Sequence, residues 1–412
     1  MLRSESSTLD VQSIRRDFPI FETGAAYLDS ANTAQRPRQV VEAMVEYFEQ
    51  YNANILRAAY AFSERATEHF EGAREKVRRF INAASTKEVI FTSGTTGGIN
   101  LVAYSWGRRN IEQGDLLVTT VMEHHSNLVP WQILAEEKGA ELAFVDIDEQ
   151  GRLRQDQFQE LLTRGPKLVA FNQISNTLGT INPYREMTRA AKEAGAIVLI
   201  DGAQGAPHLG FDVRETGCDF YAFSSHKMCG PTGIGVLYGR RELLREMPPF
   251  LAGGEMINVV SLERSTYADL PHKFEAGTQP IAEAIGLGAA IDYLESVGME
   301  AIKRHDAELT EYAHESLSEV PGLRVFGPPP GPDRTGVLSF DVDGIHPHDI
   351  ATILDRHDVY CRSGHNCTMP LMTRLDVAAT VRASVYLYNT REEIDRLVAG
   401  LHDARRIFGV ER

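Results

Sequence analysis

The amino-acid sequence predicts an α/β protein with a largely parallel sheet covered by helices on both faces. Short apolar runs of the length of buried strands recur in the first half of the chain, and helical patterns separate most of them. These runs are residues 88–92, 116–120, 142–145, 167–171 and 197–201. Strands that alternate with helices are typical of this fold class, in which ligands bind at the carboxyl ends of the strands.

Composition excludes several classes of protein. The chain has 412 residues, of which 43% are hydrophobic and 24% charged, as in ordinary globular proteins. No run of about 18 apolar residues could span a bilayer. The 42 Lys and Arg against 57 Asp and Glu give a net charge of −15, which repels nucleic acid and anionic membranes, so we expect a small-molecule substrate. Four scattered cysteines are too few to staple the chain, which favours a reducing cytoplasm.

The periodicity of the remaining segments predicts two domains. Amphipathic or Ala-rich helices are expected at 37–50, 63–82, 281–298 and 301–319, and a small α/β unit of strand 337–342, helix 347–356 and strand 381–386 ends the chain. The proline-rich loop 326–333 is the strongest linker-like stretch, and we expect it on the surface. We therefore predict a large domain over 20–295 and a smaller one made of 1–19 and 296–412.

One lysine stands among small and hydroxyl residues in Ser224-Ser-His-Lys227, just before a glycine-rich turn. A lysine whose amine is desolvated, or lies near other cations, loses its proton readily, as carbonyl chemistry through a Schiff base requires. On this segment alone, an ordinary surface lysine in a loop would be the more common explanation. The polar segments that follow three other predicted strands favour a Schiff-base lysine over a surface lysine.

Three further segments place polar groups directly after predicted strands. Asp201 ends the run 197–201, where a carboxylate can meet the protonated nitrogen of a bound ring, as in pyridoxal phosphate enzymes. Residues 92–98 open a helix with hydroxyls and glycines that can cradle a phosphate, without the lysine of a nucleotide-binding P-loop. His124 offers an imidazole that can stack on a flat cofactor or relay a proton.

Cys367 lies in a short loop, residues 362–370, that also contains Arg362 and His365. Neighbouring cationic groups favour the thiolate, which is the nucleophilic form of cysteine. Two other interpretations exist: free cysteines are commonly packing residues, and Cys361, His365 and Cys367 have a spacing that resembles a metal site. No fourth ligand lies nearby in the sequence, so we expect no metal.

The motifs together resemble the group II, SufS-type cysteine desulfurases, which are class V aminotransferase-like enzymes of fold-type I with pyridoxal phosphate as cofactor. The resemblance covers nearly the whole chain. The motifs occur in the order seen in that family: Gly94-Thr-Thr96, Glu123-His-His125, Ser175-Asn-Thr-Leu-Gly-Thr180, Asp201-Gly-Ala-Gln204, His226-Lys227, Phe274-Glu-Ala-Gly-Thr278 and Arg362-Ser-Gly-His-Asn-Cys367.

For the cofactor ring, the resemblance implies four residues of this chain. Lys227 would be the Schiff-base lysine, Asp201 would meet the pyridine nitrogen, Gln204 the ring hydroxyl, and His124 would stack on the ring.

For the phosphate group, the resemblance implies Thr95, Thr96, Ser224 and His226. Thr278 would reach the phosphate from the other subunit of a homodimer.

For the substrate, Arg382 and Asn176 would hold the carboxylate of the amino acid, and Asn176 would also face the cofactor. Arg362 would flank the entrance and Cys367 would be the catalytic nucleophile.

The reaction that the resemblance implies is the conversion of L-cysteine to L-alanine with a persulfide on Cys367. The persulfide would pass to a small SufE- or SufU-like acceptor protein and onward to iron–sulfur cluster assembly. A selenocysteine lyase or cysteine sulfinate desulfinase would use the same cofactor site with little need of Cys367, and a cofactor-free scaffold is a third class. Three features depart from the family pattern: Leu56-Arg-Ala-Ala-Tyr60, Gly97 in place of glutamate, and Asn366 in place of a histidine. These departures bear on substrate preference and the sulfur acceptor.

Overall fold

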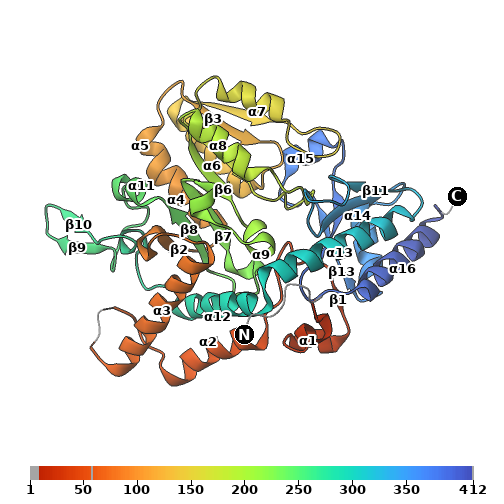
Figure 1. The fold of residues 1–412 in the computed structure, drawn as a ribbon, viewed down its shortest axis with the longest axis horizontal. Helices are drawn as coiled ribbons and strands as arrows, with labels where there is room; N and C mark the ends of the chain where they lie inside the picture. The colour runs from red at the N-terminus through yellow and green to blue at the C-terminus, as the bar shows by residue number, and fades with distance from the viewer. Residues whose placement is uncertain (1–8, 57–58, 411–412) are drawn as a thin grey trace.

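A computed structural model describes residues 9–56 and 59–410, and its ribbon is shown in Figure 1. Arg57 and Ala58, which belong to one of the departures from the family pattern, lie outside the described residues. Helices in the first part of the chain are α1 (Val11–Arg15), α2 (Arg38–Gln50), α3 (Ala61–Phe80), α4 (Thr95–Leu101), α5 (Arg108–Asn110), α6 (Val129–Lys138), α7 (Gln155–Leu162), α8 (Tyr184–Glu193), α9 (Gly205–Leu209), α10 (Val213–Thr216), α11 (Arg241–Glu246) and α12 (Ile281–Val297).

A mostly parallel sheet of seven strands forms the centre of this part within the described residues, as predicted. Its spatial order is β2 (Val89–Thr92), β8 (Gly235–Gly239), β7 (Phe220–Ser224), β6 (Ile197–Asp201), β5 (Leu168–Asn172), β3 (Leu116–Thr120) and β4 (Glu141–Val145). Alternate residues of one strand enter different cores: in β5, Val169 and Phe171 pack in one cluster, Leu168 and Ala170 in another. This alternation is what a sheet covered on both faces requires.

Strand β7 was not among the predicted strands, although it leads directly to Lys227. The sequence pattern drew attention to the hydroxyl residues at its end and not to the apolar run before them. Strand β8 returns antiparallel to β7, and Ser224 lies opposite Gly235. The chain between these two residues is therefore a closed loop at the carboxyl end of β7.

The second part of the chain contains a four-stranded antiparallel sheet among the described residues, in the order β11 (Leu323–Phe326), β12 (Val337–Val342), β15 (Thr380–Ser384) and β14 (Arg362–Gly364). Its helices are α13 (Met299–Ser318), α14 (Pro347–Asp355), α15 (Met369–Arg374) and α16 (Arg391–Phe408), of which α15 and α16 were not predicted. In Figure 1 this part lies to the right of the large sheet, and α13 runs along both.

The amino-terminal segment joins the second part. Strand β1 (Ala26–Tyr27) pairs in parallel with β13 (Val359–Tyr360), and Ala26 and Leu28 pack in the same core as β12 and β15. Arg15 of α1 forms an ion pair with Glu393 of α16. The domain division at residues 19/20 and 295/296 stays a prediction.

The loop 326–333 lies partly on the surface, as expected, with Pro329, Gly331 and Pro332 exposed, but tertiary contacts fix it. Phe326 and Pro328 are buried, Asp333 forms an ion pair with Arg152, and the carbonyl of Asp333 accepts a hydrogen bond from the Ile181 amide. Buried Arg334 donates to the carbonyls of Phe326 and Pro328 and so closes the loop on itself, while the contacts of Asp333 hold it against the large sheet's side of the molecule. This loop therefore has a fixed position between the two parts of the chain.

A hairpin of β9 (Ile257–Val260) and β10 (Ser265–Tyr267) projects away from the body, at the left of Figure 1. Val259, Val260 and Leu262 of this hairpin are exposed. Over residues 9–56 and 59–410, no helix combines the length and the apolar character needed to cross a membrane.

Candidate active site

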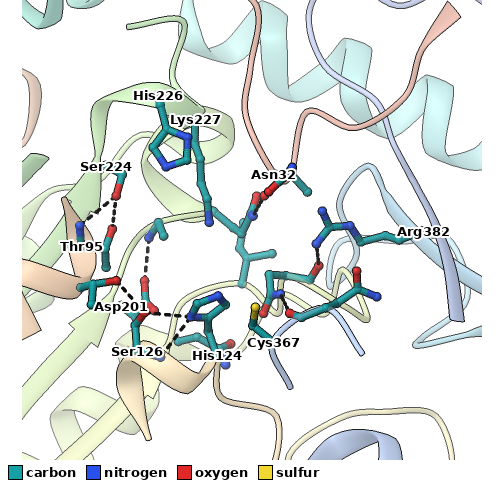
Figure 2. A pocket seen from close by; sticks show the side chains of 18 of the residues that line it. Asn32, Thr95, His124, Ser126, Asp201, Ser224, His226, Lys227, Cys367 and Arg382 are labelled. Carbon is teal, nitrogen blue, oxygen red and sulfur yellow. Dashed lines mark hydrogen bonds between the residues drawn. The ribbon is translucent and has the colours of Figure 1, made fainter. Parts of the chain in front are cut away.

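A cavity of about 160 Å³ lies at the carboxyl ends of the large sheet's strands, where the second part of the chain closes over them. Figure 2 shows side chains from both parts converging on it. Of the predicted site residues, all but Thr278 line this cavity: Thr95, Thr96, His124, Asn176, Asp201, Gln204, Ser224, His226, Lys227, Arg362, Cys367 and Arg382. The structure thus brings together groups that lie far apart in sequence, from Thr95 to Arg382.

Lys227 follows β7 in a short 3₁₀ turn, and its side chain extends into the cavity from one side (Figure 2). Shielding of the amine from bulk water lowers its pKa to about 8, although the carboxylate of Asp201 acts in the opposite direction. The cation of Arg382 lowers the pKa further. The neutral amine that a nucleophile or base requires is therefore reached near pH 8, well below the pH at which an ordinary lysine loses its proton.

Asp201 ends β6 and is buried. Burial raises its pKa, while the amide of Ala203, which donates to Oδ1 at 2.9 Å, and the nearby Lys227 amine lower it. Gln204 donates from Nε2 to the Ala31 carbonyl at 2.6 Å, and its buried Oε1 has no hydrogen-bond partner. A buried acceptor without a partner is costly, so this oxygen calls for a donor from a ligand.

His124 lies after β3 and lines the opposite side of the cavity from Lys227 (Figure 2). Burial and the nearby Lys227 cation lower its pKa to about 3, so the imidazole is neutral. Its Nδ1 accepts a hydrogen bond from the Ser126 amide at 3.1 Å. The proton of the neutral ring is therefore on Nε2.

Glu123 supports the turn that carries His124. Its buried carboxylate accepts from the Thr120 hydroxyl, from the Asn127 side chain, and from both the amide and the side chain of Asn172. Burial raises the pKa of Glu123 to about 8 despite these donors. Asn172 lies beside Asp201 in the β5–β6 register and also lines the cavity, so one network holds two of its walls.

A cluster of hydroxyls lies where α4 begins. The amide and hydroxyl of Thr95 both contact the Ser224 hydroxyl, at 2.8 and 2.7 Å, and the Thr96 hydroxyl lies 2.6 Å from that of Ser126. Gly94 has φ +135°, and a Cβ there would come within 3.3 Å of Ser224 Oγ. Glycine keeps this corner open for a group that binds hydroxyls and amides.

The wall formed by the second part of the chain is cationic. Arg362 on β14 lies directly opposite Arg382 on β15. Arg382 is buried, and it donates from Nη1 to the Asn176 carbonyl at 2.9 Å and from Nη2 to Asp29 at 3.2 Å, while its Nε has no partner. Two neighbouring guanidinium groups facing a cavity favour an anionic ligand, such as the carboxylate of an amino acid.

Cys367 lies at the edge of the cavity, between His124 and Arg382 in Figure 2. Asn366 and Cys367 both adopt left-handed backbone conformations, with φ of 50° and 58°. Each such residue carries a strain of about 1 kcal/mol or more, which persists only where surrounding contacts hold it. Burial raises the pKa of the thiols of Cys218, Cys229 and Cys361, which disfavours their nucleophilic form.

Thr278 does not line this cavity. It is exposed at a second cavity of about 430 Å³, together with Ser93 and Gly97 at the start of α4. A Cβ at position 97 would lie 2.6 Å from Ser93 Oγ, so the glycine at this departure from the family pattern leaves room for the Ser93 side chain. The role of Thr278 toward a partner subunit stays a prediction.

Sequence reasoning missed several residues of the cavity wall, among them Ala31, Asn32, Ser126 and Asn172. Asn172 directly follows the predicted strand 167–171, so the rule that polar groups at strand ends build the site would have found it. Ala31 and Asn32 lie far from any predicted strand, and tertiary contacts hold their segment at the site, among them the bond from the Ala31 amide to the Ser384 hydroxyl. Within the described ranges, no three His, Cys, Asp or Glu side chains come together as metal ligands.

Comparisons with known proteins agree with this geometry. The model of the aminotransferase class-V family matches residues 26–397. A relative from Halalkalibacterium halodurans named "Probable cysteine desulfurase" is 49% identical over 97% of this chain and 99% of its own, and a "Cysteine desulfurase" from Haloferax volcanii is 46% identical over 98% and 99%.

Solved structures give the same result. The apo cysteine desulfurase from Thermococcus onnurineus has a TM-score of 0.93 and 40% identity, with 97% of this chain and 99% of that chain covered. The Escherichia coli cysteine desulfurase CsdA has a TM-score of 0.91 and 38% identity, with 97% and 100% covered. The predicted fold is thereby confirmed, whereas the group II subdivision stays a prediction. With the family model matched over most of its length and relatives near 50% identity along nearly all of it, the chain belongs to the aminotransferase class-V family.

Proposed function

We propose that this protein is a cysteine desulfurase, which converts L-cysteine to L-alanine and carries the sulfur as a persulfide on Cys367. The observation that carries the proposal is the presence of a cysteine thiol in the same cavity as an amine with a lowered pKa and a pair of arginines. A transaminase needs the amine and the carboxylate clamp but no thiol at this place. Sulfur transfer needs all three.

The cavity has the groups that fit pyridoxal phosphate. The partnerless Oε1 of Gln204 is suited to the ring hydroxyl, and the hydroxyl cluster beside Gly94 is suited to the phosphate. Lys227 would bind the aldehyde, Asp201 would hold the proton of the ring nitrogen, and His124 would pack on the ring. Thr95, Thr96, Ser224 and His226 would hold the phosphate, with Asn176 near the ring's substrate side.

When bound, pyridoxal phosphate supplies an electron sink for the electron pair left at the substrate's α-carbon. Arg382 orients the substrate by its carboxylate, with Arg362 at the entrance. The neutral amine of Lys227 takes the α-proton, which its lowered pKa allows. Burial raises the pKa of the Asp201 carboxyl, whereas the Ala203 amide, which donates to its Oδ1, lowers it, and this carboxyl would meet the ring nitrogen.

Cys367 takes the sulfur. Its Sγ forms a bond to the sulfur of the substrate while the bond between that sulfur and the substrate's β-carbon breaks. The electron pair of the broken bond stays with carbon, which takes up a proton and becomes the methyl group of alanine. Hydrosulfide leaves carbon poorly, so direct transfer to a nucleophile is the easier route.

The persulfide on Cys367 would leave the protein by transfer to a SufE- or SufU-like acceptor for iron–sulfur cluster assembly. We propose a homodimer in the cytoplasm as the working form, with Thr278 facing the partner's phosphate site. The half-exposed position of Cys367 at the rim of the cavity supports transfer to another protein, because a fully enclosed sulfur could not be reached.

The test is to incubate the purified protein, supplied with pyridoxal phosphate, with L-cysteine and to measure alanine and the mass of the peptide that contains Cys367. We expect alanine and one added sulfur. Cys367→Ser should stop alanine formation from cysteine while the protein still turns over selenocysteine or cysteine sulfinate, whose selenium and sulfinate groups leave more easily. If Cys367→Ser forms alanine from cysteine at the wild-type rate, the proposal is wrong and a lyase is favoured.

A further inference from the structure

Two adjacent histidines after β3 have different surroundings. His124 lines the cavity, whereas His125 contacts the loop that carries Cys367. The turn between β3 and α6 therefore touches both the proposed cofactor position and the proposed sulfur carrier. This inference rests on the proposed function and concerns how the cysteine is held there.

His125 makes two hydrogen bonds to this loop, one at Cys367 itself and one two residues further along the chain. Its amide donates to the carbonyl of Cys367 at 2.8 Å. Its Nε2 accepts from the amide of Met369 at 3.1 Å. The imidazole also packs against His365, with ring centroids 5.7 Å apart.

The part of the loop next to these bonds is the strained part. Asn366 and Cys367 hold left-handed conformations that non-glycine residues adopt only under constraint. The Cys367 amide donates to His365 Nδ1 at 3.0 Å within the same loop, so the ring that His125 packs against is itself bonded to Cys367. Contacts from Asn176 to the Asn366 carbonyl and from Thr177 to Thr368 fix the neighbouring residues.

We propose that His125 is a positioning residue for Cys367: its ring nitrogen and its amide together hold the cysteine in its left-handed conformation at the edge of the cavity. Any residue at position 125 other than proline can make the hydrogen bond from its backbone amide to the Cys367 carbonyl. The bond from Met369 requires an acceptor at the distance of Nε2, which is the specific contribution of histidine. Without it, Cys367 would leave the conformation in which its sulfur meets the substrate.

A matched pair of variants isolates this contribution. In His125→Gln the side-chain oxygen reaches about as far as Nε2, and it accepts a hydrogen bond; in His125→Asn the oxygen is one methylene short. Both variants keep the backbone amide. His402→Asn, on the exposed face of α16, controls for the loss of a histidine.

Two measurements apply to the cofactor-loaded protein. The first is the steady-state rate of alanine formation from cysteine, separated into kcat and KM. We expect His125→Asn to lower kcat by about 10-fold to 100-fold, as small misplacements of reacting groups do, with KM and cofactor absorbance unchanged. His125→Gln should recover to within about threefold of wild type on the same scale.

The second measurement is hydrogen exchange at the Met369 amide, which does not depend on turnover. It should be at least about tenfold faster in His125→Asn than in wild type, and close to wild type in His125→Gln and His402→Asn. Equal kcat in His125→Asn and wild type would overturn the inference, as would a His125→Gln variant as impaired as His125→Asn. An unfolded His125→Asn protein would also contradict it, because the residue would then serve folding. If wild type forms no alanine, the proposed function fails, and the exchange comparison alone decides whether His125 holds the loop.

Discussion

The two walls of the cavity are built in different ways. On one wall, Asp201 ends a buried strand of the large sheet, and Lys227 and His124 follow two others. On the other wall, Arg382 is on a strand of the small sheet, whereas Cys367 is in a strained loop held by contacts from the large sheet's side.

The difference shows that the first wall depends on the fold of the large sheet alone, whereas the second wall depends on how the small sheet packs against it. Neighbouring parallel strands place their carboxyl ends at one edge wherever the sheet folds. The second wall exists only when the antiparallel sheet of β11, β12, β15 and β14 docks on the first part of the chain. Changes on the first wall should therefore affect cofactor binding, and changes on the second should affect substrate handling with the cofactor retained.

The largest effect is expected from Lys227→Ala on the first wall. Without the amine, the cofactor has no covalent anchor and the α-proton has no base, so turnover should fall by at least about 1000-fold for every substrate. The visible absorbance of protein-bound cofactor and its reduction by borohydride onto position 227 should both be lost. If the Lys227→Ala protein still forms a borohydride-stable adduct, another lysine binds the cofactor and the assignment of Lys227 is wrong.

Arg382→Lys tests the second wall. Lysine keeps the charge but not the planar fork that binds a carboxylate with two parallel bonds, and it cannot replace both the bond to Asn176 and that to Asp29. The loss should be about 2 to 4 kcal/mol, a fall of about 30-fold to 1000-fold in kcat/KM for cysteine. Cofactor absorbance should stay at its wild-type level. If kcat/KM of Arg382→Lys equals that of the wild type, Arg362 becomes the candidate for binding the carboxylate.

The pH dependence of cofactor attachment sharpens the comparison further. Below a pKa of about 8 the Lys227 amine is protonated and unreactive, and above it the amine is neutral. The rate at which cofactor-free protein forms its covalent link with pyridoxal phosphate should rise through about pH 8 and then level off. Asp201→Asn removes the anion that raises this pKa, so the midpoint should move to lower pH. A midpoint that moves upward would contradict the stated electrostatics.

The smallest expected effect is that of Thr278→Ala. If the hydroxyl donates to the phosphate in the partner subunit, its loss should weaken cofactor retention about tenfold, the value of one charge-assisted hydrogen bond. Turnover at saturating cofactor should change little. Equilibrium dialysis measures retention, and a fully active monomer in solution would refute the shared site altogether.

The fold and most of the first wall were predictable from the sequence. Apolar runs marked five strands of the large sheet, and the rule for strand ends located Asp201 and His124. Lys227 stood out through its hydroxyl- and glycine-rich surroundings, whereas strand β7 escaped because its hydroxyl-rich end resembled a loop. Helix α16 was overlooked although Thr390 and Glu393 form a capping box at its start.

The second wall could not be derived from periodicity, because it depends on contacts between distant segments. The roles of Arg382 and Asn176 were assigned through the resemblance to known enzymes, and that resemblance also gave Cys367 its role as nucleophile. No local sequence pattern predicts that Arg382 donates to the Asn176 carbonyl, or that residues 366 and 367 adopt left-handed backbone conformations. The contacts that fix the proline-rich loop could not be predicted for the same reason, since its ion pair to Arg152 is a tertiary contact.

The antiparallel return of β8 has a consequence for how the chain can vary in length. Because Ser224 pairs with Gly235, the loop of residues 225–234, which contains Lys227, is fixed at both of its ends to two neighbouring strands of the sheet. A Cβ at Gly235 would lie 2.5 Å from Gly94 Cα, so the strand has no room to slide and absorb an extra residue. Insertions should be rejected in this loop and accepted in the projecting turn 261–264 between β9 and β10, where nothing in the cavity depends on chain length.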